Sequence, residues 1–353
     1  MRRGWTTGAC ATAAAKAAYA ALLTGEFPDP VEITLPGGQR PSFSLAKERR
    51  GSEAALAAVI KDAGDDPDVT HGALVFATVR RGAVGSGVSF RAGVGVGTVT
   101  KPGLPLPVGE PAINPMPREM IRTAIAEIAA ALGDGGDVVV EIGVENGEVL
   151  AAQTWNPRLG ILGGLSILGT TGIVMPYSCA AWIHSIHRGI DVARATGERH
   201  VAGSVGNTSE RAVAQYHGLS QGALLDMGDF AGGLLKYLRS HPVPRLTLAG
   251  GFAKMSKLAH GYLDLHSGRS QVDLAGLAEL AATMGASAEI RARIASGNTA
   301  LEALQRAQEG GIDLAGAVAI RARAVALEVL DGAPVDVDVL VVDRQGMPIG
   351  HAG

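Results

Sequence analysis

The chain has 353 residues, of which 47 % are hydrophobic and only 18 % are charged, so it can bury a sizeable core and is long enough for two domains. A net charge of −3 excludes a general nucleic-acid binder. Two cysteines exclude a disulfide framework and fit a reducing cytoplasm. Residues 159–183 carry no charge and are long enough to span a bilayer, but their glycines and Pro176 favour a strand, a loop and the start of a helix.

The first half of the chain mixes predicted helices and strands. We expect helices at residues 9–23, 52–60 and 117–132, and strands at 31–35, 74–79 and 88–90. Asn146 and Gly147 separate two alternating apolar runs, which predicts a β-hairpin. That hairpin argues against a nucleotide-binding loop at residues 141–147, because such a loop needs a helix directly after it.

The second half alternates predicted strands with predicted helices. Strands are expected at residues 200–204, 223–227, 246–249 and 337–342, and helices at 210–217, 230–238, 253–259, 274–284, 299–307 and 314–330. This alternation is typical of a parallel sheet covered by helices. We therefore predict an α/β chain: an α+β domain over residues 1–195, followed by a Rossmann-like α/β domain with a mostly parallel sheet over residues 196–353.

A Thr-Thr-Gly motif opens the first predicted helix. Thr6 or Thr7 can cap this helix, and with Gly8 in the first turn its free backbone N–H groups can meet an anion. The alternative is a plain helix cap that packs by its alanines. Thr170 and Thr171 precede a second such glycine inside the charge-free stretch.

The strand at residues 200–204 ends in a glycine turn that opens a helix. Gly203, Gly206, Asn207 and Thr208 then lie at the carboxyl end of a parallel strand, where ligands bind in such sheets. Asp226 ends the next strand, where a carboxylate can accept hydrogen bonds from ribose hydroxyls. The full Gly-x-Gly-x-x-Gly pattern is absent, so an ordinary strand–helix turn remains the alternative.

Other polar side chains lie beside glycine or proline turns. Each of them can contact an anionic ligand, or it can simply be solvated at the surface. They are Lys254 with Lys257, His266 with Ser267, Lys101 in a glycine-rich run, and Asn114 with Arg118 in a proline-rich turn. His184 and His187 share one helix face, and no further ligands match them, so we expect no protein metal site. Cys10 is expected to be a packed thiol.

Several segments together resemble one family, the cobalt-precorrin-5B C1-methyltransferases. They are residues 4–18 (GWTTGACATAAAKAA), 61–73, 93–121, 166–178 (SILGTTGIVMPYS) and 251–267 (GFAKMSKLAHGYLDLHS). The resemblance implies methylation of C1 of cobalt-precorrin-5B to cobalt-precorrin-6A, in cobalamin biosynthesis, with S-adenosylmethionine as methyl donor. Cobalt would arrive only within the corrinoid substrate. No catalytic acid or base is identified.

Under this resemblance the glycine-turn residues and Asp226 would hold S-adenosylmethionine. The substrate-binding residues would be Thr6, Thr7, Gly8, Lys101, Asn114, Arg118, Thr170, Thr171, Lys254, His266 and Ser267, so the N-terminus of the first helix would face the ligand. The expected partner is a small corrinoid, with neither nucleic acid nor membrane, in the cytoplasm, and a homo-oligomer is left open. The alternatives are a nucleotide-dependent oxidoreductase of another class and a non-catalytic corrinoid-binding protein.

Overall fold

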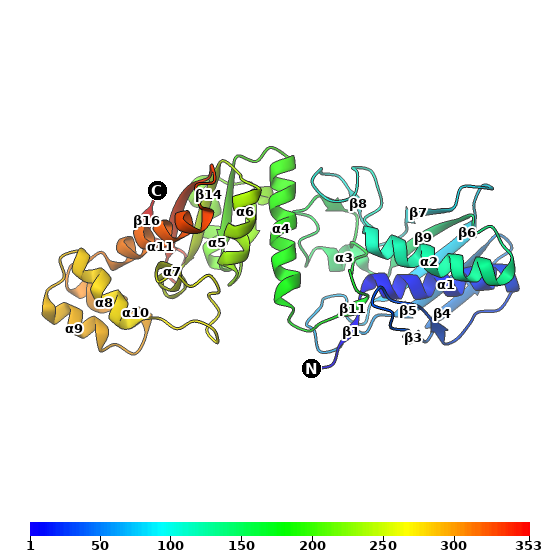
Figure 1. The fold of residues 1–353 in the computed structure, drawn as a ribbon, viewed down its shortest axis with the longest axis horizontal. Coiled ribbons are helices and arrows are strands. Elements are labelled where there is room, and N and C mark those ends of the chain that lie inside the picture. The colour runs from blue at the N-terminus through cyan, green and yellow to red at the C-terminus, as the bar shows by residue number, and fades with distance from the viewer. The chain divides into compact units, whose positions relative to one another are not determined.

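The computed structural model describes residues 1–353 and divides into two compact units, Met1–Ser178 and Cys179–Gly353 (Figure 1). Helix α4 (Cys179–Ala195) belongs to the second unit. The division therefore falls before this helix, whereas the sequence led us to expect it after residue 195.

The first unit is built on a five-stranded sheet. Its strand order is β4 (Lys47–Arg50), β5 (Ala54–Ile60), β6 (Leu74–Arg81), β9 (Val138–Val144) and β7 (Val88–Ala92), and only β7 and β9 pair in parallel. Helices α1 (Thr7–Thr24) and α2 (Pro115–Leu132) pack on each other, and α1 also packs on β5 and β6. The alanines of α1 are almost all buried, so the helix backbone lies close to the sheet (Figure 1).

Two predictions for this sheet are wrong. Residues 52–60 form β5 rather than a helix, and Ala55, Ala57 and Val59 face the core with the period of a strand. The hairpin at Asn146 is also absent: α3 (Gly147–Ala151) follows β9 instead. Strand β9 already pairs with β6 on one side and β7 on the other, so it has no free edge for a hairpin partner.

Three pairs of short strands hold the loops of the first unit. They are β1 (Gly4–Trp5) with β11 (Ile173–Val174), β2 (Val31–Glu32) with β3 (Ser42–Phe43), and β8 (Thr98–Val99) with β10 (Ile161–Leu162). The charge-free residues 159–183 thus contain two short strands, loops and the start of α4, as expected. None of the helices is long and apolar enough to cross a membrane.

The second unit contains the mostly parallel sheet that the sequence predicts. Strands β13 (Leu224–Asp226), β12 (His200–Ser204), β14 (Arg245–Gly251) and β15 (Asp336–Val342) are parallel in this order, and β16 (Pro348–Ala352) adds an antiparallel edge. The chain leaves β12 for β13 on one side and later returns to β14 on the other. The strand order therefore reverses between β12 and β14.

Helices cover both faces of this sheet. Helix α5 (Asn207–His217) packs on one face through Ala212 and Val213. The other face carries the larger core, which includes residues of α4, α6 (Ala231–Ser240), α7 (Phe252–Ala259) and α11 (Leu314–Leu330) and extends into the three helices described next. A short 3-10 turn (Gln221–Ala223) leads into β13.

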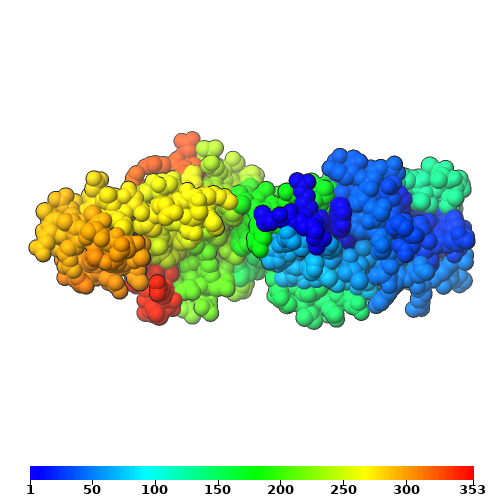
Figure 2. Space-filling model, turned by 90° about the horizontal axis from the view of Figure 1, so that it is seen from below, coloured from blue at the N-terminus to red at the C-terminus, as the bar shows by residue number.

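Three further helices form a lobe beyond the sheet of the second unit. These are α8 (Leu274–Thr283), α9 (Ala288–Ala295) and α10 (Ala300–Glu309), drawn in yellow and orange (Figures 1 and 2). Helix α9 and strand β16 were not predicted, and of α4 only the start was expected. The other strands and helices of this unit lie within a few residues of the predicted ranges.

Candidate functional site

A cavity of about 580 Å³ lies at the carboxyl ends of the parallel strands, where the strand order reverses. The loop after β12, the start of α7 after β14 and the turn after β15 line it, and α10 adds two leucines. Its residues are Val205, Gly206, Asn207, Thr208, Ser209, Gly251, Phe252, Ala253, Lys254, Leu301, Leu304, Val342, Asp343, Arg344, Gln345 and Ile349. Ligands of open α/β sheets bind at such reversal points.

Two helices present open backbone donors to this cavity. Helix α5 begins after Gly206 and α7 begins after Gly251, and neither glycine can cap with a side chain. The backbone N–H groups of Asn207, Thr208 and Phe252 make no hydrogen bond within the protein. A Cβ atom on Gly206 would meet nothing within 4 Å, so the space in front of α5 is open. Both helix starts can therefore receive an anionic group.

The remaining walls combine apolar surface with three charged residues, Lys254, Asp343 and Arg344. Phe252, Leu304 and Ile349 form the apolar part. Lys254 donates through Nζ to the Asp229 carboxylate and to the Leu265 carbonyl oxygen, which lies 3.0 Å away. Asp343 accepts backbone hydrogen bonds from the turn that it precedes. An apolar cavity with a few fixed polar groups is typical of a small-molecule site.

The structure brings four of the predicted site residues to this cavity: Gly206, Asn207, Thr208 and Lys254. Gly203 lies in the core instead, where an added Cβ would be 2.6 Å from Leu234 Cδ2. Asp226 is not among the residues that line the cavity; it ends β13, which pairs with β12. Its carboxylate accepts from the Gly228 backbone N–H at 3.3 Å.

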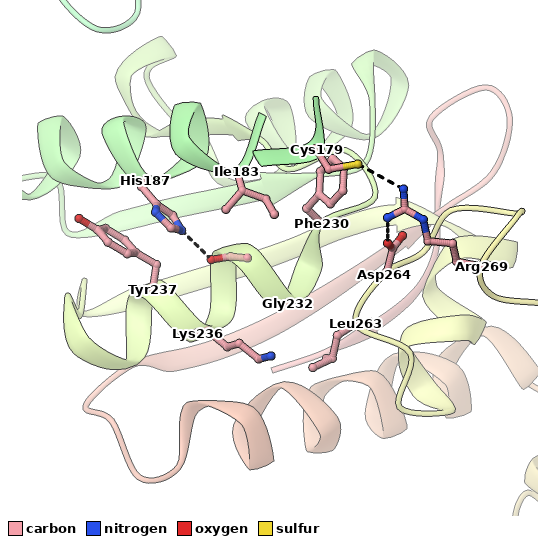
Figure 3. A pocket seen from close by; sticks show the side chains of 11 residues that line it. Cys179, Ile183, His187, Phe230, Gly232, Lys236, Tyr237, Leu263, Asp264 and Arg269 are labelled. Atoms are coloured by element: carbon pink, nitrogen blue, oxygen red, sulfur yellow. Dashed lines mark hydrogen bonds and ion pairs between the residues drawn. The ribbon is translucent and has the colours of Figure 1, made fainter. Parts of the chain in front are cut away.

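A second cavity of about 520 Å³ lies between α4, α6 and residues 263–269 of the same unit (Figure 3). Ile183, Phe230 and Leu263 give it apolar walls. Lys236 and Arg269 add positive charge, Lys236 without any ion-pair partner and Arg269 paired with Asp264. Arg269 also donates to Cys179 Sγ at 3.2 Å. These walls suit a large apolar ligand that carries carboxylates.

Stacked rings form one side of the second cavity. The rings of His187 and Tyr237 stack with centroids 3.9 Å apart, and His241 stacks on the other face of Tyr237 at 4.0 Å. The Tyr237 hydroxyl donates to Asp191, and burial lowers the pKa of His187. Glycines bring α6 close to its neighbours, since a Cβ on Gly232 would lie 2.8 Å from Leu263 Cβ.

A polar cluster connects Lys254 of the first cavity to residues that are next in sequence to lining residues of the second. Lys254 lines the first cavity, and its partners Asp229 and Leu265 adjoin residues that line the second. Lys257 is almost fully buried beside it and donates to the Leu265 carbonyl oxygen at 3.1 Å. Burial, and then the charge of Lys254, lower the pKa of Lys257.

The first turn of α1 is closed rather than ligand-facing. Thr6 caps it by accepting from the Ala9 N–H, while the Gly8 N–H donates to the Leu168 carbonyl oxygen at 3.0 Å. Thr7 Oγ1 donates to that same oxygen and accepts from the Leu168 N–H. The expectation of free donors in this turn is therefore wrong, because Thr6 occupies the Ala9 N–H and Leu168, just before the second Thr-Thr-Gly motif, occupies the Gly8 N–H.

The other predicted substrate residues of the first unit hold its loops together. Arg118 donates to the carbonyl oxygens of Ile113 and Pro111 and pairs with Glu110. The stem of Lys101 covers Gly160, and the backbone N–H of Asn114 donates to Ile167. Thr170 and Thr171 are exposed. In the second unit, His266 and Ser267 lie in an exposed loop outside both cavities.

Comparison with known proteins gives the family. The CbiD model matches residues 1–176 and the model of the CbiD C-terminal domain matches residues 264–353. A curated Paramagnetospirillum magneticum protein named cobalt-precorrin-5B C(1)-methyltransferase is 63 % identical over 352 residues, which cover 100 % of this chain and 98 % of that one. The chain belongs to the CbiD family.

A second curated relative supports the same assignment. A Rhodospirillum rubrum protein of the same name is 62 % identical over 353 residues, covering 100 % of this chain and 98 % of its own. A crystal structure of cobalamin biosynthesis protein cbiD from Archaeoglobus fulgidus is 24 % identical, covers 88 % of this chain and 85 % of its own, and gives a TM-score of 0.41. The family expected from the sequence segments is confirmed.

Sequence reasoning missed part of the cavity lining in this CbiD chain. The turn Asp343–Gln345 follows the last parallel strand directly, so its position after a buried apolar run was an available signal. Leu301 and Leu304 of α10 reach the first cavity through tertiary packing alone. No local sequence pattern indicates that they line it. The ring stack around Tyr237 likewise joins two helices that are distant in sequence.

Proposed function

We propose that this CbiD chain methylates C1 of cobalt-precorrin-5B with S-adenosylmethionine as the methyl donor. The supporting observation is the donor-lined cavity at the reversal point of the sheet, in a chain whose relatives carry the name of this methyltransferase over their whole length. The cavity takes the donor, and the second cavity takes part of the corrinoid.

The first cavity fits the chemistry of S-adenosylmethionine. Its volume of about 580 Å³ lies within the range of about 300–1,000 Å³ for small-molecule sites. The open N–H groups of α5 and α7 match the carboxylate at the methionyl end, and the apolar wall around Phe252 and Leu304 matches the flat adenine ring. Asp343 offers a carboxylate for ribose hydroxyls, the role that we expected of Asp226.

The second cavity fits the chemistry of a corrinoid. A corrinoid is a large, mostly apolar macrocycle with carboxylate side chains at its edge. Ile183, Phe230 and Leu263 offer apolar contact, while Lys236 and Arg269 offer positive charge at the margin. Lys254 of the first cavity bonds to Asp229 and Leu265, which adjoin Phe230 and Asp264 of the second cavity along the chain, so this cluster is where the proposed donor and substrate would approach each other.

The chain acts mainly by positioning. When bound, S-adenosylmethionine supplies an electrophilic methyl group on a positively charged sulfur. The starts of α5 and α7 orient the donor, and the apolar walls exclude water from the reacting atoms. Holding two reactants in line in this way contributes about 7–11 kcal/mol to a lowered barrier. This requirement explains why no acid–base pair is evident in either cavity.

The direct test is methyl transfer by the purified full-length chain. Cobalt-precorrin-5B is incubated with S-adenosylmethionine that carries a deuterated methyl group, and mass spectrometry follows the macrocycle. We expect the mass gain of one labelled methyl group, located on C1 by nuclear magnetic resonance. A corrinoid that binds without gaining mass would make the chain a binding protein, and a mass gain at another carbon would contradict the proposed regiochemistry.

A matched pair of variants tests the donor site. Gly206→Leu fills the open space before α5, where an added Cβ meets nothing within 4 Å, so the fold is expected to persist while donor affinity falls at least about tenfold. Gly51→Leu changes an exposed glycine in the first unit and is expected to leave that affinity unchanged. Isothermal titration with S-adenosylmethionine measures the donor affinity of both variants. Equal affinities would mean that the donor does not bind in this cavity.

A further inference from the structure

Three histidines surround one buried carboxylate at the opposite end of the second sheet. His200 begins β12, His217 ends α5, His351 lies on β16, and Asp338 is the third residue of β15. Asp338 is 1 % exposed. These residues lie at the amino ends of the parallel strands, whereas the proposed donor cavity lies at the carboxyl ends, so the methyl-transfer proposal does not use them.

The two oxygens of the Asp338 carboxylate have different surroundings. Oδ1 accepts from Thr247 Oγ1 at 2.9 Å and from Arg245 Nε at 3.1 Å. Oδ2 faces His217 Nε2 at 2.9 Å and His351 Nε2 at 3.6 Å. One oxygen is thus fixed by neighbouring groups, and the other points at two imidazoles. Carboxylates that bind metals are commonly held in this way by outer hydrogen bonds.

We infer that His200, His217 and Asp338, with His351 as a fourth ligand, bind a divalent transition-metal ion of the zinc class. One ligand atom from each of the first three residues lies within 4.8 Å of the others. Zinc bonds of about 2.0–2.2 Å place tetrahedral ligand atoms about 3–4 Å apart, so a small side-chain movement closes the site. Imidazole with carboxylate, in the absence of thiolate, suits Zn²⁺, Ni²⁺ or Co²⁺.

The hydrogen bonds of His200 show what binding must change. Its Nε2 lies 2.7 Å from Thr247 Oγ1, which donates its own proton to Asp338, so His200 is the donor in this contact. Metal binding requires His200 to leave Thr247 and present an unprotonated nitrogen.

The metal would have a structural effect within the second unit. Its ligands come from β12, α5, β15 and β16, so one ion would join three strands and the end of the helix that covers them. Arg245 Nε is close to the carboxylate and its charge opposes the ion, which predicts a moderate rather than an extreme affinity.

The test uses the full-length protein after treatment with a chelator. Isothermal titration with Zn²⁺ is expected to give one ion per chain, and Co²⁺ is expected to produce the visible absorption bands of tetrahedral coordination. His217→Ala and the half-exposed His351→Ala should each lower zinc affinity at least about tenfold. His71→Ala, an exposed histidine of the first unit, is the matched control and should leave it unchanged.

Two results would overturn the inference. Wild-type protein that binds no more zinc than His217→Ala would reduce the cluster to a hydrogen-bond network. Arg245→Gln keeps a donor for Asp338 but removes its charge, and should tighten zinc binding several-fold, so a loss of binding in this folded variant would equally contradict the site. Circular dichroism of each apo variant confirms that the fold is intact, and neither readout depends on methyl transfer.

Discussion

At the scale of single residues, Gly8 lies where α1, α2 and the loop at 168–172 meet. An added Cβ would lie 2.8 Å from Pro117 Cγ and 3.1 Å from the Leu168 carbonyl oxygen. We expect Gly8→Val to lower the free energy of unfolding by about 1–3 kcal/mol, because the packed neighbours must move apart. Urea unfolding measures this, with the exposed Gly51→Val as control. A stable Gly8→Val protein that no longer binds a corrinoid would restore the ligand-facing interpretation of this turn.

Lys61 is a second residue whose role is structural. It is 1 % exposed, and its Nζ lies 2.6 Å from Asp68 Oδ2. Removing one member of a buried pair leaves the other uncompensated, so we expect Lys61→Met to cost about 3 kcal/mol at neutral pH. Lys47→Met is the control, since Lys47 forms only an exposed pair with Glu145, and it should change stability by less than about 1 kcal/mol.

The pH dependence of the same pair has a definite sign. Burial raises the pKa of Asp68, but attraction to Lys61 and hydrogen bonds outweigh it, so the pKa is lowered. A carboxyl group whose pKa is lowered by folding stabilises the fold at pH values above its pKa in the unfolded chain, about 3.9. This contribution is lost as the pH falls through the pKa of the group in the folded protein. The stability difference between wild type and Lys61→Met should therefore shrink below about pH 4. A difference that grows in acid would contradict this pairing.

At the scale of elements, the strands and helices of the second unit were the most predictable from sequence. Buried runs such as residues 200–204 alternate there with amphipathic helices. The apolar periodicity and the turn residues therefore indicate the same strands and helices. Prediction failed where tertiary pairing decided the outcome. Alanine favours helices, yet β5 is a strand because β4 and β6 pair with it on both sides. Asn146 takes the left-handed conformation of a hairpin turn, but the chain continues into α3.

Helix α6 carries a prediction of its own. Lys236 lines the second cavity, whereas Arg239, three residues later on this helix, does not. We expect Lys236→Met to weaken binding of a carboxylated corrinoid about five- to tenfold. The reason is that the variant loses one hydrogen bond between a charged ammonium group and a carboxylate, and solvent partly screens this bond. Arg239→Met should have no effect, and the difference should fall at high salt. Equal losses for the two variants would indicate a general charge effect instead of a site on α6.

At the scale of the whole molecule, the cavity that we propose for the donor combines a predicted glycine turn with segments that the sequence did not indicate. The sequence identified Gly206, Asn207 and Thr208 because a glycine turn follows a buried strand. The same reasoning pairs them with Asp226, because this carboxylate ends the next predicted strand, about twenty residues beyond Gly206. In the order of the sheet, β14 and β15 lie on the other side of β12, and Asp343 and the start of α7 at their ends line the cavity. Local patterns do not encode this order.

The division into two units leads to the last prediction. Every residue that lines the proposed donor cavity comes from the second unit, and that unit has its own core on both faces of its sheet. Residues 179–353 produced alone are therefore expected to fold, and to bind S-adenosylmethionine within about threefold of the full-length affinity, since the buried contacts of the site are retained. Circular dichroism and thermal unfolding establish the fold, and isothermal titration measures binding, with the Gly206→Leu fragment as the non-binding control. A cooperatively folded fragment that fails to bind the donor, while the full-length chain binds it, would mean that the first unit supplies part of the site.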